Sequence, residues 1–257
     1  MSCWRKIFAV IFCGAALLLA GGCSGNKETL PQLLSRAVTC GQQGKWQDCE
    51  KLAMEVLKRN PEEPYALLLR ALAAEHLGRM DVALESARQA AEKAPEDFPC
   101  QYTYGRLLAM KHQAAKTALQ VLERALKLRP GNRNTLLLLG LCSSRINSDN
   151  AIDYYNQLPA GVKSLPEIQT RIAIYYLDRR DRDRQNITLA YNALRNAHKS
   201  APHNPAIVLN LALFLDHYVQ NRNVAVKLYR NYLTLTEHNP ELNPTRAQVR
   251  ARMSSMR

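Results

Sequence analysis

The stretch GKWQDCEKLAMEVLKRNPEEP at residues 44–64 decides the fold, because residues 78–98, GRMDVALESARQAAEKAPEDF, repeat its plan 34 residues later. In both copies a glycine opens the stretch and a proline follows 17 residues on, while small or apolar residues recur every three or four positions. This helical periodicity within a longer repeat predicts pairs of antiparallel helices stacked side by side. We therefore expect an all-α chain.

Small residues recur at matching places in the two repeats. Ala53 takes such a place in the first repeat, and Ala83, Ala87 and Ala90 take such places in the second. The pattern resembles the tetratricopeptide repeat, in which a glycine and an aromatic residue form the turn between two helices and a proline ends the second helix. The resemblance implies a right-handed superhelical α-solenoid of about six such repeats over residues 30–240.

The pattern weakens toward the C-terminus. Pro159 comes early in the fourth repeat, so we expect the second helix of that repeat to be short. In the fifth repeat the charged run at residues 178–184 lengthens the turn, and we expect a solvated loop whose Asp and Arg side chains pair with one another. The basic segment at residues 241–257 allows two outcomes, a short helix that caps the last repeat or a disordered tail.

The first 22 residues have the composition of a secretion signal. Arg5 and Lys6 precede an apolar run at residues 7–20. At 14 residues this run is shorter than the roughly 20 that a membrane-spanning helix needs. We therefore expect residues 1–22 to be a signal peptide and not a transmembrane anchor.

The sequence LAGGCS at residues 19–24 resembles the bacterial lipobox, although Ala20 stands where leucine is commoner. The resemblance implies cleavage before Cys23, lipidation of the Cys23 thiol and a short tether that completes residues 23–29. An ordinary cleavable signal with an unmodified Cys23 is the alternative. By the same resemblance, Ser24 after the cysteine implies sorting to the periplasmic face of the outer membrane.

Composition gives no sign of catalysis. The chain has a formal net charge of +13, which we interpret as a solubilising surface, since a secreted protein is not expected to bind nucleic acid. The six histidines show no metal-ligand spacing, and no Gly-rich phosphate loop or nucleophile–base set is apparent. We expect a protein that is not an enzyme, has no catalytic residues and needs neither metal nor cofactor.

The resemblance further implies a concave groove, lined by the first helix of each repeat, that binds envelope proteins or peptides. Aromatic, aliphatic and Arg side chains suit such a surface, although any one of them could instead pack between repeats. The candidate groove residues are Tyr65, Leu68, Leu72, Tyr102, Arg106, Asn134, Leu137, Leu141, Arg145, Leu209 and Asp216.

Two cysteines fall on the facing helices of the first repeat. In an oxidising compartment Cys40 and Cys49 could form a disulfide, and two small buried thiols are the alternative that we favour.

These features together predict an outer-membrane lipoprotein that acts as a non-catalytic adaptor in envelope assembly. One alternative is a pilotin-like assembly factor for a type IV pilus or secretin machine, by analogy of architecture. Another is an accessory of cell-wall or carbohydrate-processing enzymes. The sequence leaves the partner and the oligomeric state open.

Overall fold

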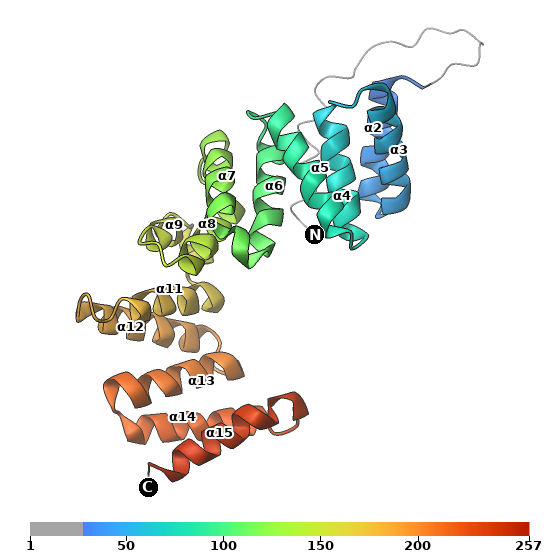
Figure 1. Cartoon of the computed structure of the whole chain (residues 1–257). Helices are drawn as coiled ribbons and strands as arrows, with labels where there is room; N and C mark the ends of the chain where they lie inside the picture. Colours follow the sequence, from blue (N-terminus) through green and yellow to red (C-terminus); the bar gives the residue numbers. More distant parts are fainter. Residues whose placement is uncertain (1–27, 257) are drawn as a thin grey trace. The chain divides into compact units, whose positions relative to one another are not determined.

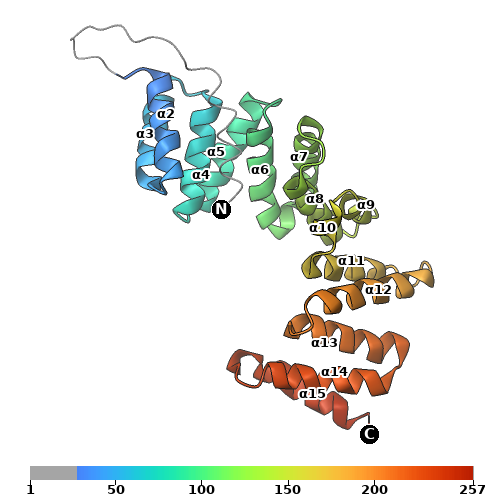
Figure 2. The same cartoon turned by 180° about the vertical axis from the view of Figure 1, so that it is seen from behind.

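The computed structural model describes residues 28–256, which form helices and turns with no strand among them. Of these, residues 28–147 form one compact unit and residues 148–256 form a second. Figures 1 and 2 show the helices of each unit from two sides. Cys23 and the expected signal peptide at residues 1–22 lie outside the described residues. No described helix is both long enough and apolar enough to cross a membrane.

The first unit is a stack of helix pairs. Each helix contacts the next one along the chain, and the first helix of each pair also contacts the first helix of the following pair. This arrangement confirms the predicted all-α solenoid of helix-turn-helix repeats. The helices are α2 (Leu30–Gln42), α3 (Trp46–Arg59), α4 (Pro64–His76), α5 (Met80–Lys93), α6 (Phe98–Met110), α7 (Ala115–Leu128) and α8 (Arg133–Arg145), with a short 3-10 turn, η2 (His112–Ala114), before α7.

The turns follow from the two glycines of the repeat. Gly44 and Gly78 have φ angles of +73° and +76°, in the left-handed region where residues with a side chain are strained. This conformation ends α2 and α4 and lets the next helix begin within three residues. Pro64 then opens α4 at a position where a helix does not need a backbone N–H.

Small residues hold the pairs together. Ala83, Ala87 and Ala90 on α5 are completely buried, and Ala83 and Ala87 pack with Ala71, Ala74 and Leu107 from α4 and α6. Because alanine brings backbones close, larger apolar side chains on the flanking helices reach across and fill the space.

The second unit continues the same plan after an irregular start. It begins with the second helix of the fourth repeat, α9 (Ala151–Asn156), which is short, as predicted from Pro159. The other elements are α10 (Ala160–Lys163), α11 (Pro166–Asp178), α12 (Gln185–Ser200), α13 (Pro205–Phe214), α14 (Arg222–Leu235) and α15 (Asn243–Ser254), with a π-helical turn, η3 (Leu215–Val219), after α13 and a 3-10 turn, η4 (Pro240–Leu242), before α15.

The charged run between α11 and α12 is in part the expected solvated, self-paired loop, since Arg180 pairs with Asp181 at 3.7 Å, but two of its arginines bond outside the run. Arg179 is buried, and its Nε donates to the Asp149 carboxylate at 2.8 Å. Arg182 donates to the same oxygen at 2.7 Å. Arg179 also lies over the ring of Tyr175, 4.0 Å from its centre. The run therefore ties α11 to the turn before α9, because a buried guanidinium must find a carboxylate wherever the fold provides one.

The segment after α14 forms a helix that covers the end of the stack. Helix α15 packs against α14 and buries Val249. Arg252 donates two hydrogen bonds to the buried carboxylate of Asp216, at 2.7 and 2.8 Å. Tyr229 donates a third at 3.0 Å. The hydrogen bonds and positive charge of Arg252 hold the pKa of Asp216 below its ordinary value.

Cys40 and Cys49 are free thiols in the structure, so the disulfide that the sequence allowed is not formed. Cys49 lies in the core with Ala37, Val38 and Ala53. Burial raises the pKa of the Cys49 thiol to about 12, because the thiolate would lose its hydration. Small size and low polarity suit this residue to packing. The buried-thiol interpretation therefore holds for Cys49, whereas Cys40 is only half-buried.

Gly105→Ala should destabilise the first unit by about 1–3 kcal/mol, because an added Cβ would lie 2.7 Å from Cγ of the buried Leu122. Urea unfolding followed by circular dichroism would measure the loss. Leu122→Ala in the same background should remove the clash, so the double variant should lose less stability than the two single losses added together. If the two losses of stability were strictly additive, contact with Leu122 would not be the reason that residue 105 must be glycine.

Arg252→Met should destabilise the second unit by about 2–3 kcal/mol at neutral pH, because it leaves the Asp216 carboxylate buried without its cation. A carboxylate whose folded pKa is lowered stabilises the fold above its unfolded pKa, near about 3.9, and loses that effect as pH falls through the folded pKa. The stability difference between the two proteins should therefore shrink below about pH 4. Arg250→Met on the exposed side of α15 is the matched control and should change stability little at either pH.

Candidate functional site

Three predicted groove residues lie inside the first unit and not on an open surface. Leu68 and Leu72 are buried in a cluster with Ala90 and Cys100. Tyr102 is also buried, and its ring stacks on Phe98 with 5.5 Å between ring centres. These positions correct the prediction, because the side of a first helix that carries large apolar residues packs against the adjacent repeats before it can face a ligand.

Polar candidates of the first unit link consecutive first helices. Arg106 on α6 donates two hydrogen bonds of 2.5 Å to the carboxylate of Glu75 on α4. Arg145 on α8 donates to the carbonyl oxygen of Ala109 on α6. These bonds give the first helices a fixed spacing, because a bidentate Arg–carboxylate pair constrains both distance and orientation.

Tyr65 makes a comparable link between α4 and the residue that caps α6. Its hydroxyl donates to the Asp97 carboxylate at 3.1 Å. Burial and the neighbouring carboxylate raise the pKa of Tyr65 to about 12. The hydroxyl is thus a neutral donor that positions a helix end.

The remaining predicted residues divide into two groups. Asn134, Leu137, Leu141 and Leu209 are half-buried, so part of each side chain lies at the surface. Asp216 is buried, with 4 % of its surface exposed, and bonds to Arg252 and Tyr229. That carboxylate belongs to the packing of α15, which corrects its assignment to a groove.

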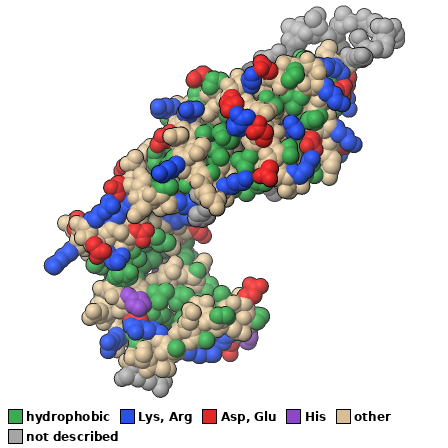
Figure 3. Space-filling model, in the orientation of Figure 1, with side chains coloured by type: hydrophobic (Ala, Val, Ile, Leu, Met, Phe, Trp, Pro, Cys, Tyr) green, Lys and Arg blue, Asp and Glu red, His purple; other side chains and the backbone are tan. Residues whose placement is uncertain are grey.

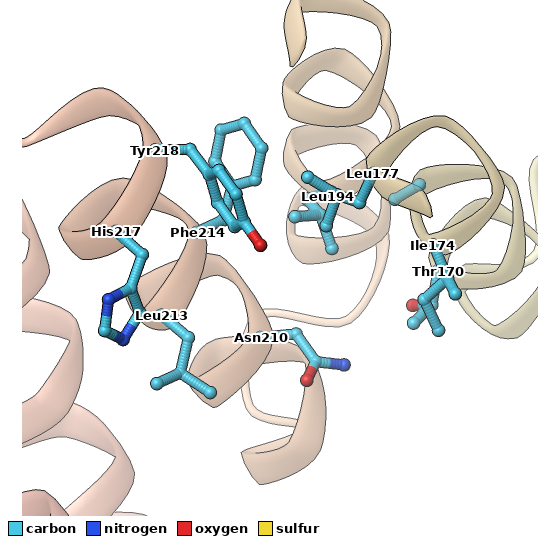
Figure 4. Close-up of a pocket in the computed structure, with 10 residues that line it drawn as sticks. Thr170, Ile174, Leu177, Leu194, Asn210, Leu213, Phe214, His217 and Tyr218 are labelled. Atoms are coloured by element: carbon cyan, nitrogen blue, oxygen red, sulfur yellow. The ribbon is translucent and has the colours of Figure 1, made fainter. Parts of the chain in front are cut away.

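An apolar groove does lie within the second unit, between α11 and α13. It has a volume of about 380 Å³. Figure 4 shows the side chains of one wall, from α13 and η3, facing those of the other wall, from α11 and α12. The lining residues are Thr170, Ala173, Ile174, Leu177, Leu194, Asn210, Leu213, Phe214, His217 and Tyr218.

The groove arises from matching stripes on two first helices. Thr170, Ile174 and Leu177 recur at helical spacing on α11, and Asn210, Phe214 and His217 do so along α13 and η3. Since side chains three, four and seven positions apart share one face of a helix, each stripe forms one wall. An elongated segment of a partner protein that lies in the groove could therefore contact both α11 and α13.

Three of the lining side chains are unusually exposed for their size. Ile174 is 50 % exposed, Leu213 38 % and Tyr218 39 %. A cluster of large exposed apolar side chains is more typical of a binding site than of the rest of a protein surface. Hydrophobic side chains are also visible at the surface of the second unit in Figure 3.

The π-helical turn η3 shapes the end of the groove. The extra residue in this turn prolongs α13 by Leu215–Val219 before Gln220 ends it in the left-handed conformation, with φ at +58°. Aromatic stacking then supports the wall, since the Phe214 ring lies between Tyr191 and Tyr218 at centre distances of 5.9 and 5.5 Å. Single π-helical turns of this kind often occur at functional sites.

The chemistry of this lining is that of recognition. It contains no carboxylate and no thiol, and its polar groups are Thr170, Asn210, His217 and the Tyr218 hydroxyl. Across residues 28–256, no group of three or more His, Cys, Asp or Glu side chains is arranged to hold a metal ion. The groove can bury apolar side chains and orient them with a few hydrogen bonds, which is the usual composition of a binding site for an apolar ligand or segment.

Along α13 and η3 the sequence prediction missed this groove by one residue of helical register, since it selected Leu209 and Asp216, whereas Asn210 and His217 line the groove. On α11 it selected no residue. One signal could have found the groove. Helix α13, PAIVLNLALF, has a single polar residue, and a helix that is apolar on every side must leave some apolar surface uncovered in a two-layer stack.

Comparisons with known proteins agree with this architecture. Residues 40–98 match the tetratricopeptide repeat family model. A search of curated protein sequences found no match.

Several solved structures have a similar fold. PilW, described as a widely conserved type IV pilus biogenesis factor, is 17 % identical, with a TM-score of 0.64 over 86 % of this chain and 99 % of its own. PilF of Pseudomonas aeruginosa is 16 % identical, with a TM-score of 0.61 over 85 % of this chain and 97 % of its own. YrrB, described as a TPR protein with an unusual peptide-binding site, is 15 % identical, with a TM-score of 0.58 over 73 % of this chain and 93 % of its own.

At these identities the likeness concerns the fold and not the activity. Residues 40–98 thus match the tetratricopeptide repeat family, and the described chain has the fold of tetratricopeptide-repeat proteins.

Proposed function

We propose that this protein is a non-catalytic scaffold that binds a partner protein through the groove between α11 and α13. The observation that carries the proposal is the exposure of Ile174, Leu213 and Tyr218 next to one another in a groove without catalytic groups. Tetratricopeptide-repeat folds serve as protein-interaction scaffolds, which supports the same conclusion.

The expected partner segment is apolar and elongated. Covering a half-exposed leucine or isoleucine removes apolar surface from water, which stabilises the complex by about 25 cal/mol for each Å² buried. A segment with apolar side chains at helical spacing would match the two stripes of the groove. Asn210 and His217 on the rim would then orient it by hydrogen bonds to its backbone or polar side chains.

We further propose that a lipid on Cys23 holds the protein at the periplasmic face of the outer membrane. The sequence around Cys23 supports this, since small residues precede it and a basic start and an apolar run lie before them. Confinement to a membrane surface raises the effective concentration of a scaffold for partners in the same membrane. A groove with a modest affinity for its partner could then be enough for stable assembly.

A second candidate function is assembly of a type IV pilus. It is favoured by one observation, the similarity of fold to PilW and PilF over nearly their whole length. In this case the partner of the groove would be a subunit of the pilus machine, such as its secretin.

The groove should be the point of capture in intact cells. A photo-reactive residue in place of Asn210 should crosslink to a defined partner, and Leu213→Arg should lower the yield at least about tenfold by placing a charge in the apolar groove. Leu189→Arg is the matched control, because Leu189 is similarly exposed at 40 % but does not line the groove. Mass spectrometry of the captured protein separates a secretin subunit from other envelope partners. Equal yields in the two variants would contradict the proposed groove.

Cys23→Ala should release the protein from the membrane fraction, because one residue carries the whole anchor in this proposal. Fractionation of cells and mass spectrometry of the wild-type N-terminus would measure this. The mass of the wild-type protein should show acyl chains on Cys23. An unmodified Cys23 in a mature protein would reject the anchor without affecting the groove experiment.

A further inference from the structure

A second surface groove lies in the first unit, and its lining is basic. It is a shallow groove of about 840 Å³ on α3, closed on its far side by α4 and the turn before α5. In Figure 3, Lys and Arg side chains gather along the edge of the first unit that α2 and α3 form. The residues lining the basic groove are Glu50, Lys51, Met54, Glu55, Lys58, Arg59, Arg70 and Arg79.

Two of the five cations in the basic groove are already paired. Arg59 bonds to Glu55 at 2.6 Å, and Arg79 pairs with Glu50. Lys51, Lys58 and Arg70 have no counterpart carboxylate among the lining residues, so the groove keeps an excess of positive charge. An excess of this kind attracts an anionic partner.

Arg70 stands at a position where three later first helices carry a buried apolar residue. It is the seventh residue of α4, and the seventh residues of α8, α11 and α13 are the buried Leu139, Ile172 and Leu211, whereas α2 has the exposed Arg36 and α6 the half-buried Tyr104. The Nε of Arg70 is buried and has no hydrogen-bond partner in the structure. A buried donor without an acceptor is costly, so this atom points to a ligand that supplies oxygen atoms.

The chain enters the first unit at the rim of this groove. Arg59, one of the lining residues, donates to the carbonyl oxygen of Glu28, and Arg36 bonds to the Glu28 carboxylate at 2.5 Å. Glu28 is five residues along the chain from Cys23, with four residues, 24–27, between them. Even fully extended, this stretch spans only about 17 Å.

We propose that the basic groove binds the phosphate groups of anionic phospholipids in the membrane that carries the lipid on Cys23. The proposal rests on the anchor described above, which places the groove within a short distance of the bilayer. Lys51 and Lys58 would contact the surface as mobile charges, and Arg70 would offer a planar donor set to one phosphate. An acidic protein segment is a weaker candidate, since the short tether leaves little space for a protein between this end of the unit and the membrane.

Binding to vesicles can be measured without the anchor. We would use the mature chain, residues 23–257 with Cys23→Ser, and vesicles of phosphatidylcholine with or without phosphatidylglycerol. The protein should partition onto the anionic vesicles alone, and added salt should release it. Lys51→Gln combined with Lys58→Gln should lower partitioning about 25-fold, at roughly fivefold for each charge.

Matched variants distinguish binding by the groove from attraction by the net charge of the whole protein. Lys116→Gln combined with Lys127→Gln removes two exposed charges from α7 in the same unit and should leave binding nearly unchanged. Arg70→Leu introduces the kind of apolar residue that α8, α11 and α13 carry at this position, and it should keep the fold while weakening binding to the anionic vesicles.

No binding to the anionic vesicles, or equal losses from the α3 and α7 double variants, would overturn the proposal. Failure of the anchor is a separate result, because it appears as an unmodified Cys23 while vesicle binding by the unlipidated chain is unaffected.

Discussion

The close approach of neighbouring helices is the constraint on which the structure depends. Gly105 lies so near Leu122 that a single added carbon atom would overlap it, and alanines fill the same kind of contact on α5. Helices at this distance leave room for nothing but their own side chains. The chain must therefore repeat small residues at fixed intervals, and each pair can then bury its apolar face against the next one.

The side chains that this packing leaves exposed form the surfaces available for binding. In the first unit, Arg106 and Arg145 are engaged in bonds between first helices, so they contribute to the spacing of the repeats. In the second unit, α13 is apolar on nearly all sides and its two-layer surroundings cannot cover it completely. The π-helical turn then extends the uncovered strip, which produces a groove suited to an apolar segment of another protein.

Charge has a different distribution from the one that composition suggests. A net charge of +13 is compatible with a uniformly solvated surface, yet the structure collects five cations in one depression on α3, α4 and the turn before α5. In the second unit, by contrast, Arg179 and Arg252 are used to hold the fold together through Asp149 and Asp216. Some basic residues in this protein thus stabilise the stack and others line a local groove, and sequence position alone does not distinguish the two uses.

The sequence by itself determined the all-α repeat, its turns at Gly44 and Gly78 and the short α9, because these features depend on local backbone conformation and helical spacing. The tertiary structure alone decided which side chains stay exposed. Leu68 and Tyr102 became buried, Asp216 became the partner of Arg252, and the groove formed at Ile174 and Leu213. The physical reason is that burial depends on what the adjacent repeats place opposite a residue, and a shift of one position along a helix turns a side chain by about 100°.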